Sequence, residues 1–390
     1  MTEREFASAV RDVDGRAFIA GGWVRDKLRG AVPHDRDYVV TGLTEEAFAA
    51  AFPGARRVGR GFPVYLLDVD GDMCEVAFAR RERKTGPGYR GFEISALPGT
   101  TIEDDLYRRD TTMNSMAESL ETGELIDPYG GASDIERRVI RATSEHFADD
   151  PVRALRAARH SAQFGCTIEP GTIRMMAKCR EELALEPGER LTNELRGALG
   201  CDVPSVFFRA LSEAGILSAA YPHIASPAGA RHGTRRHPDG DAFERTMQVL
   251  DRAAEMTART EARFAALALG LGISALREWN AVTPLPSPWM RCAEFAITER
   301  ARVCGIREPE EIAAFMERIR NHPLAIDGIT AIVMADAHEI PTFLEYAPKL
   351  LKAMGGVTGD DIPDDLKGPA RGEWLRRRKT EAVARAIPMI

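Results

Sequence analysis

Asp35, Asp37 and Glu75 are the residues whose type and spacing best suit metal-dependent chemistry. Asp35 and Asp37 lie two residues apart and lead into a short apolar run at 38–41 that is typical of a strand. Side chains two apart on an extended chain point to the same face, so both carboxylates are expected to converge on one site. Glu75 lies in another expected strand and can face that site. Carboxylates this close repel one another unless a cation neutralises them, and Mg²⁺ prefers oxygen ligands. Three of them suit a two-metal phosphoryl-transfer centre.

A glycine pair upstream of these acids favours a phosphate substrate. Gly21 and Gly22 end an expected strand and open an expected helix, where backbone N–H groups can hold a triphosphate. Arg25 lies one turn into that helix and can reach the same phosphates. Each feature alone has an ordinary structural explanation, because acidic surface pairs and tight glycine turns are common. Their succession along the chain is what indicates phosphoryl transfer.

Short apolar segments supply the elements that must position these groups. The predicted strands cover residues 17–20, 38–41, 64–69 and 73–79. A helix is predicted over 23–29, ended by Gly30, and an Asp-Gly pair at 70–71 predicts a hairpin turn. Together they predict a small antiparallel or mixed sheet. Helical periodicity takes over from about residue 134, so the fold class is α+β, with an α/β head followed by an all-α chain.

Composition bounds the class of protein. The chain has 390 residues, 44% of them hydrophobic, which fits a soluble protein of several packed units. No apolar run reaches the roughly 18 residues of a membrane span, and the N-terminus is acidic where a signal peptide is basic. We therefore expect a cytoplasmic protein. The six cysteines occur singly, so neither a zinc cluster nor a disulfide framework is indicated.

Two basic clusters bear on nucleic-acid binding. The net charge of −7 argues against such a partner, but phosphate binding depends on local clusters rather than on the average. RHGTRRH at 231–237 and RRRK at 376–379 are clusters of this kind. Each can equally be a solvated surface, so they allow an RNA partner without establishing one.

The order of short motifs over about residues 17–200 resembles one family, the class II CCA-adding enzymes and bacterial poly(A) polymerases. The motifs that carry the resemblance are GGWVRD at 21–26, DRD at 35–37, EVAFARRERK at 75–84, EDDLYRRDTTMN at 103–114, IDPYGG at 126–131, FADDPVRALRAAR at 147–159 and ERLTNEL at 189–195. The segment GRGFPVYLL at 59–67 looks more like tRNA nucleotidyltransferases than poly(A) polymerases. The long basic C-terminal extension expected of the latter is missing.

The resemblance implies an architecture and an activity. It implies a polymerase-β-like nucleotidyltransferase head at 1–140, a base-recognising helical neck at 141–205, a helical body at 206–300 and a tRNA-binding tail at 301–390. The implied reaction adds C, C and A from CTP and ATP to the 3′ acceptor end of tRNA and releases pyrophosphate. In it, Asp35 and Asp37 hold two Mg²⁺ ions, Glu75 assists deprotonation, and Gly21, Gly22 and Arg25 hold the triphosphate.

Asp150 and Arg153 correspond to the family's base-reading positions. They lie three apart on a predicted helix, hence on one face. Cytosine and adenine each offer an amino donor beside a ring-nitrogen acceptor, which a carboxylate and a guanidinium match. Uracil and guanine would leave both groups unpaired, which supports discrimination of roughly 10³ or more. Arg156 and Arg159 continue the stripe as nucleotide contacts, although a solvated arginine stripe is the alternative.

The RRD block adds three nucleotide-site residues, and several positions depart from the family pattern. Arg109 is the candidate for contacting the nucleotide, Asp110 for orienting arginines, and Asn114 completes the set. The departures are Asp149 for the usual Glu, Thr111, Met113 and Ser115 for commoner apolar residues, and His160 for an aromatic residue. None of them removes a catalytic group.

Some relatives carry a metal-dependent HD hydrolase domain, and this chain lacks its ligands. Leu269 and Gly270 stand at the HD pair and Arg245 at an upstream ligand histidine. Leucine and glycine cannot bind a metal, so we expect a helical scaffold without hydrolase activity. The alternatives for the whole chain are a CC-adding or A-adding partial enzyme, a poly(A) polymerase, or a non-catalytic RNA-binding protein of the same fold.

Overall fold

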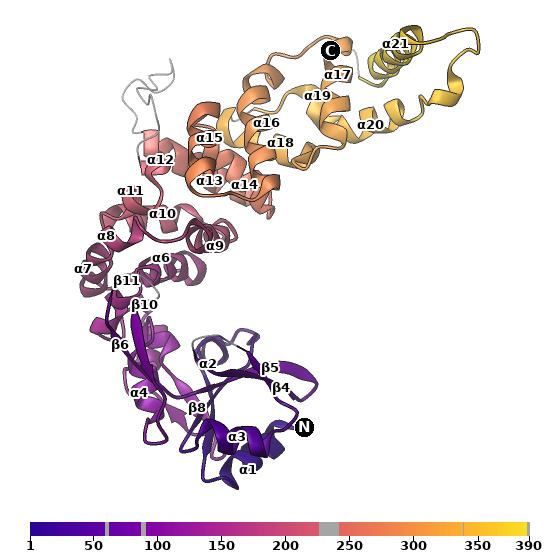
Figure 1. Cartoon of the computed structure of the whole chain (residues 1–390). Helices are drawn as coiled ribbons and strands as arrows, with labels where there is room; N and C mark the ends of the chain where they lie inside the picture. The colour runs from indigo at the N-terminus through magenta and orange to yellow at the C-terminus, as the bar shows by residue number, and fades with distance from the viewer. Residues whose placement is uncertain (59–61, 87–90, 226–241, 338, 388–390) are drawn as a thin grey trace. The chain divides into compact units, whose positions relative to one another are not determined.

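The computed structural model describes residues 1–58, 62–86, 91–225, 242–337 and 339–387 (Figure 1). The chain divides into two compact units, Met1–Leu191 with Val206–Ala220, and Thr192–Ser205 with Tyr221–Ile390. The finer division into head, neck, body and tail stays a prediction. The basic cluster at 231–237 and the first three residues of the 59–67 segment lie outside the described residues.

Among the described residues, all strands belong to the first unit. They are β1 (Arg16–Ala20), β2 (Asp37–Thr41), β3 (Arg56–Val58), β4 (Val64–Val69), β5 (Asp72–Phe78), β6 (Arg81–Lys84), β7 (Phe92–Ser95), β8 (Ala117–Ser119), β9 (Leu125–Ile126), β10 (Val139–Ile140) and β11 (Thr167–Ile168). Helix α9 (Gly188–Leu199) crosses from the first unit into the second. The other helices before residue 221 are α1 (Glu3–Arg11), α2 (Gly22–Leu28), α3 (Glu45–Ala51), α4 (Ile102–Tyr107), α5 (Gly131–Glu136), α6 (Val152–Phe164), α7 (Pro170–Lys178), α8 (Arg180–Leu183), α10 (Ser205–Glu213) and α11 (Leu217–Ala220).

The predicted mixed sheet is confirmed and has seven strands in the order β3-β4-β5-β2-β1-β8-β9. Neighbouring strands run antiparallel except β2 and β5, which are parallel. The predicted hairpin joins β4 to β5, with Asp70 and Gly71 both at positive φ (56° and 86°). Such turns match the right-handed twist of the strands, which is why an Asp-Gly pair is favoured there.

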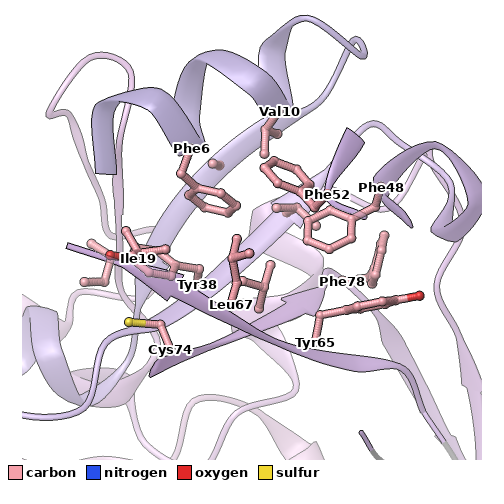
Figure 2. Close-up of a cluster of buried hydrophobic side chains, with 14 of the residues drawn as sticks. Phe6, Val10, Ile19, Tyr38, Phe48, Phe52, Tyr65, Leu67, Cys74 and Phe78 are labelled. Carbon is pink, nitrogen blue, oxygen red and sulfur yellow. The ribbon is translucent and has the colours of Figure 1, made fainter. Parts of the chain in front are cut away.

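Both faces of this sheet are covered by helices. On one face α1 and α3 pack their aromatic side chains against the strands; Figure 2 shows Phe6 and Phe48 above the sheet residues Tyr38 and Tyr65. Each fully buried phenylalanine of this kind contributes about 1.5–3 kcal/mol. The other face packs against Ile102 of α4 and its neighbours. Because side chains alternate along a strand, the residues on either side of Tyr38 point to the α4 face.

The chain beyond the sheet is helical, as predicted, with one correction. Strand β11 lies inside the segment predicted to be an all-helical neck, and it pairs in parallel with β10 at the end of the predicted head. Each has two residues, too few for an alternation of apolar and polar residues to show in the sequence. Among the described residues, no helix combines the length and the apolar character needed to cross a lipid bilayer.

The second unit is built around a buried helix. Its helices are α12 (Pro222–Ala225), α13 (Ala242–Met256), α14 (Thr260–Ala268), α15 (Gly272–Val282), α16 (Ser287–Val303), α17 (Pro309–Arg320), α18 (Ala325–Ala337), α19 (Thr342–Glu345), α20 (Ala347–Gly355) and α21 (Pro369–Ala386). Helix α14 is buried on all sides, and α13, α16 and α18 pack against it. Its buried Arg263 donates hydrogen bonds to four backbone carbonyls, those of Leu199, Cys201, Ala254 and Thr257.

Candidate active site

Asp37 and Glu75 form an acidic pair on the α4 face of the sheet. They are direct partners in the parallel register of β2 and β5, so their side chains project side by side. Both residues are exposed at the surface of the sheet. Partial desolvation, Glu75 and Asp35 together raise the pKa of the Asp37 carboxyl, while Arg109 opposes them. The pair therefore carries excess negative charge.

Asp35 acts on this pair, but its backbone is not extended as the sequence predicts. The extended chain begins only at Asp37, and Asp35 has a left-handed backbone with φ of 54°. Aspartate tolerates that conformation better than most residues, because its short side chain can bond locally. The alternation argument therefore fails for Asp35, although its charge still acts on Asp37.

The acidic site fits a hard divalent cation in its chemistry. Its donors are carboxylate oxygens, the ligands that Mg²⁺ prefers. Glu75 and Asp35 repel the charged form of Asp37, and Arg109 stabilises it. Among the described residues, no three carboxylates, histidines or cysteines form a preassembled metal cluster. The site consists of the Asp37–Glu75 pair with Asp35 beside it.

Gly21 shapes the entry to α2. Its backbone (φ 80°, ψ −126°) is one that side chains disfavour, and a Cβ there would lie 2.6 Å from Nη1 of Arg109. Its N–H donates to the Met116 carbonyl at 3.0 Å, so this N–H is not available to a phosphate. The helix begins at Gly22. The N–H groups of Gly22 and Trp23 lie in its first turn, where the hydrogen bonds within the helix provide no carbonyl acceptor for them.

Arg25 is held by three neighbours. Its Nε and Nη2 donate to the two oxygens of Asp26, each at 2.9 Å, and its Nη1 donates to Asn114 Oδ1 at 2.6 Å. The guanidinium also lies over the Phe164 ring, 4.7 Å from its centroid. A phosphate at Arg25 would therefore compete with the Asp26 carboxylate.

Arg109 is fixed by a buried acid that sequence reasoning missed. Asp105 Oδ2 accepts from Arg109 Nη2 at 3.0 Å and from Nε at 3.2 Å, and Arg108 pairs with the other oxygen. Burial acts to raise the pKa of Asp105, but Arg108 and Arg109 outweigh it and lower the pKa. The charged carboxylate can thus hold Arg109 beside Gly21 and the acidic pair.

Asp110 pairs with an arginine of α6. Its Oδ2 accepts from Arg156 Nε at 2.8 Å, and its Oδ1 accepts from the Asn114 amide at 2.9 Å. Burial acts to raise the pKa of Asp110, but Arg156 and Asn114 contribute to lowering it instead. Since Asn114 also accepts from Arg25, these residues link α2 to α6 through one polar chain.

Asp150 does not lie on the helix that carries Arg153, contrary to the prediction. Its backbone is extended (φ −114°, ψ 110°), and α6 begins after Pro151. A proline disfavours the helical conformation in the residue before it, which excludes Asp150 from the helix. The Asp150 side chain instead accepts from the Val152 N–H at 3.1 Å, at the start of α6.

Both base-reading candidates have protein partners in this structure. Asp150 Oδ2 accepts from Arg190 Nη2 at 2.7 Å, and Arg190 is held in turn by Glu186. Arg153 donates to the His146 carbonyl and lies 3.8 Å from Glu82. These contacts occupy the groups that would face a base.

Arg159 contacts residues of its own helix. Its Nη1 donates to Gln163 Oε1 at 2.9 Å, and its Nη2 lies 3.3 Å from Nε2 of His160. The structure thus places Arg156 and Arg159 in different surroundings, although both belong to the predicted stripe.

The missed residues share one feature. Asp105, Glu82, Arg190 and Phe164 each contact a candidate residue directly, and Glu186 in turn holds Arg190. Asp105, Glu82 and Arg190 lie inside motifs quoted above, so the motif was visible but the contact was not. These contacts join residues 4 to 139 positions apart, so they depend on how the chain folds back.

The chain is similar to known proteins over most of its length. Residues 17–141 match the family described as the poly A polymerase head domain, and residues 165–226 match a probable RNA and SrmB-binding site of polymerase A. The chain is 45% identical to the multifunctional CCA protein of Methylococcus capsulatus (strain Bath), and the match covers 95% of each chain.

Two solved structures have the same fold over nearly all of the chain. One is the CCA-adding enzyme of Bacillus stearothermophilus in complex with CTP, with a TM-score of 0.71 and 25% identity over 98% of this chain and 92% of that one. The other is the Thermotoga maritima CCA-adding enzyme complexed with tRNA, with a TM-score of 0.70 and 20% identity over 98% and 93%.

Proposed function

The chain belongs to the family of multifunctional CCA proteins, and from that premise we propose that it adds C, C and A to the 3′ end of tRNA without a template. Its substrates are CTP and ATP, and it works in the cytoplasm. The observation that carries the proposal is the Asp37–Glu75 pair. Arg109, which is held beside Gly21, interacts electrostatically with Asp37 of this pair.

The reaction is a phosphoryl transfer. The terminal hydroxyl of the tRNA attacks the α-phosphate of the nucleotide, the bond to the β-phosphate breaks, and pyrophosphate leaves. Arg25 and Arg109 hold the triphosphate as cations, and Arg25 exchanges Asp26 for phosphate oxygens. Glu75, beside Asp37, assists removal of the hydroxyl proton.

Asp35 and Asp37 would hold Mg²⁺. The bound ions would neutralise charge on the phosphates and make the attacking hydroxyl more acidic. The raised pKa of Asp37 supports this role, because the carboxylate gains from a nearby cation more than an isolated aspartate would.

Asp150 and Arg153 select the base. In this structure the Asp150 carboxylate is paired with the cation Arg190, and the Arg153 guanidinium lies near the anion Glu82. Each base-reading group therefore has a partner of opposite charge. We propose that the pairing edge of cytosine or adenine displaces these partners. Uracil and guanine present the opposite pattern and would leave two desolvated groups unpaired.

We also propose that the second unit has no HD-type hydrolase activity. Arg245 donates to Asp336 at 3.1 Å, and Arg300 donates to the other oxygen of the same carboxylate. A Cβ at Gly270 would lie 3.5 Å from Oγ1 of Thr246, which places position 270 beside α13, the helix that carries Arg245. Two guanidinium groups repel a divalent cation. Metal-stimulated phosphatase activity in the pure protein would contradict this proposal.

The tail contributes phosphate contacts to tRNA. On α21, Lys379 pairs with Glu317 at 2.9 Å, Arg378 donates to Glu381 at 2.8 Å, and Arg377 lies 3.8 Å from the same carboxylate. Part of the RRRK cluster is therefore neutralised within the protein. The rest suits backbone contacts to RNA, which weaken as salt rises.

Product length tests the proposal. tRNAs that lack CCA, that end in one C and that end in CC are each offered CTP, ATP or both. Growth to CCA followed by a stop is the expected result. A stop at CC, use of the CC-ended tRNA alone, or a long A tail would identify the partial enzymes or a poly(A) polymerase. The D35A/D37A double variant should bind tRNA normally without extending it; extension by that variant would refute the mechanism.

A further inference from the structure

Three buried polar residues lie near one buried carboxylate, that of Asp110. They are Thr111, Ser115 and His160. Thr111 donates its N–H to Asp110 Oδ1 at 2.7 Å, and the Ser115 hydroxyl donates to the Thr111 carbonyl at 3.0 Å. The His160 ring and Asp110 lie close enough to interact electrostatically. Asp110 thus sits in a buried polar pocket.

His160 carries an unused donor in this pocket. Arg159 Nη2 lies 3.3 Å from His160 Nε2, and since a guanidinium can only donate, Nε2 must accept. Burial lowers the pKa of His160 well below its usual value, so the ring is neutral and its proton is on Nδ1. That Nδ1 has no hydrogen-bond partner within the described part of the chain. An unpaired buried donor destabilises the state that contains it, so its presence points to another state in which the donor is used.

The ring is held in position on the α6 face that carries Arg156. The two residues are four apart on α6 and so lie on the same side of the helix. His160 stacks on Phe164 with 5.3 Å between ring centroids, and Phe164 in turn supports Arg25. His160 therefore lies between the arginine that pairs with Asp110 and the aromatic ring under Arg25.

Asp110 needs a second partner if Arg156 is to contact a nucleotide. Only 5% of Asp110 is exposed, and Arg156 is a charged partner of its Oδ2. If Arg156 turned to a nucleotide, that oxygen would lose this bond while still buried, which is costly. We propose that His160 is a positioning residue whose Nδ1–H takes over from Arg156 at Asp110 when Arg156 engages the incoming nucleotide. This inference rests on the proposed nucleotide-binding function.

Equilibrium binding of CTP and ATP to the full chain tests the exchange. His160→Phe keeps the stacked ring and removes both nitrogens, so binding should weaken by about tenfold while thermal stability stays equal or rises. His160→Asn keeps an N–H near the place of Nδ1 and should bind within about threefold of the original chain. His322→Phe is the matched control, because His322 also stacks on a phenylalanine, Phe295, in the second unit. It should bind nucleotides unchanged.

The coupling to Arg156 sharpens the test. In an Arg156→Gln background, His160→Phe should have no further effect on either dissociation constant, because there is no exchange left to support. Nucleotide binding by His160→Phe that equals the original chain overturns the inference. Equal weakening in His160→Asn and His160→Phe also overturns it, since it indicates packing rather than the donor. Nucleotide binding without incorporation into tRNA would instead overturn the proposed function and leave this inference standing.

Discussion

Replacing Gly21 with alanine should impair the triphosphate site more than it destabilises the fold. The backbone at Gly21 has φ of 80° and ψ of −126°, a conformation that an alanine adopts only with strain of about 1–3 kcal/mol. The new methyl would also lie 2.6 Å from Nη1 of Arg109. That nitrogen is the far end of a flexible side chain, so Arg109 moves rather than the backbone. Its Nη1 would then lose the 3.4 Å contact to the Asn114 carbonyl.

Urea unfolding and steady-state incorporation of CTP separate the two effects. Gly21→Ala should lose about 1–3 kcal/mol of stability, and kcat/KM should fall by about a hundredfold because Arg109 is displaced. Gly30→Ala is the matched control, since Gly30 also has positive φ (71°) but nothing within 4 Å of an added Cβ. It should lose about 1 kcal/mol and keep its activity. Equal activity of the two variants at equal folded fraction would refute the role assigned to Arg109.

Three further predictions concern single residues. Asp37→Asn should reduce incorporation by about a thousandfold or more, because a carboxylate proposed to hold Mg²⁺ is lost. Its melting temperature should be unchanged or higher, because the repulsion from Glu75 that raises the pKa of Asp37 is relieved. Asp110→Asn should be less stable than the original chain at neutral pH. The lowered pKa of Asp110 means that its contribution is fully present above about pH 4 and is lost as pH falls through the folded-state value, so urea midpoints of the two proteins should converge in acid. Arg263→Met should cost about 3 kcal/mol or more in urea unfolding, because four buried carbonyls lose their donor; a loss under 1 kcal/mol would show that water replaces the arginine.

The sheet could be predicted from the sequence because its signals are local. The run at 64–69 matches β4 to the residue, and the Asp-Gly turn forms where the sequence predicts it. The two-residue strands β10 and β11 left no such signal, since alternation cannot be seen in two residues. The parallel pairing of β2 with β5 was also not predictable, because the strands join only after the chain between them has folded back.

In the candidate site, too, some features could be predicted from the sequence and others could not. The residue types and their order indicated phosphoryl transfer, and the register places Glu75 beside Asp37. Two expectations based on regular strand and helix geometry were wrong, because the local backbone departs from that geometry. Asp35 adopts a left-handed conformation, and Pro151 keeps Asp150 out of the helix of Arg153.

By itself, the sequence determined which chemical groups are present and in what order, because motif identity and turn chemistry are properties of neighbouring residues. Only the tertiary structure decided what each group contacts. Arg109 is held by buried Asp105, Asp150 by Arg190, and Asp110 by Arg156. The last two partnerships join residues 40 and 46 positions apart. Such pairs depend on the packing of whole elements, and that packing is what turns Asp35, Asp37 and Glu75 from scattered acids into neighbours around one site.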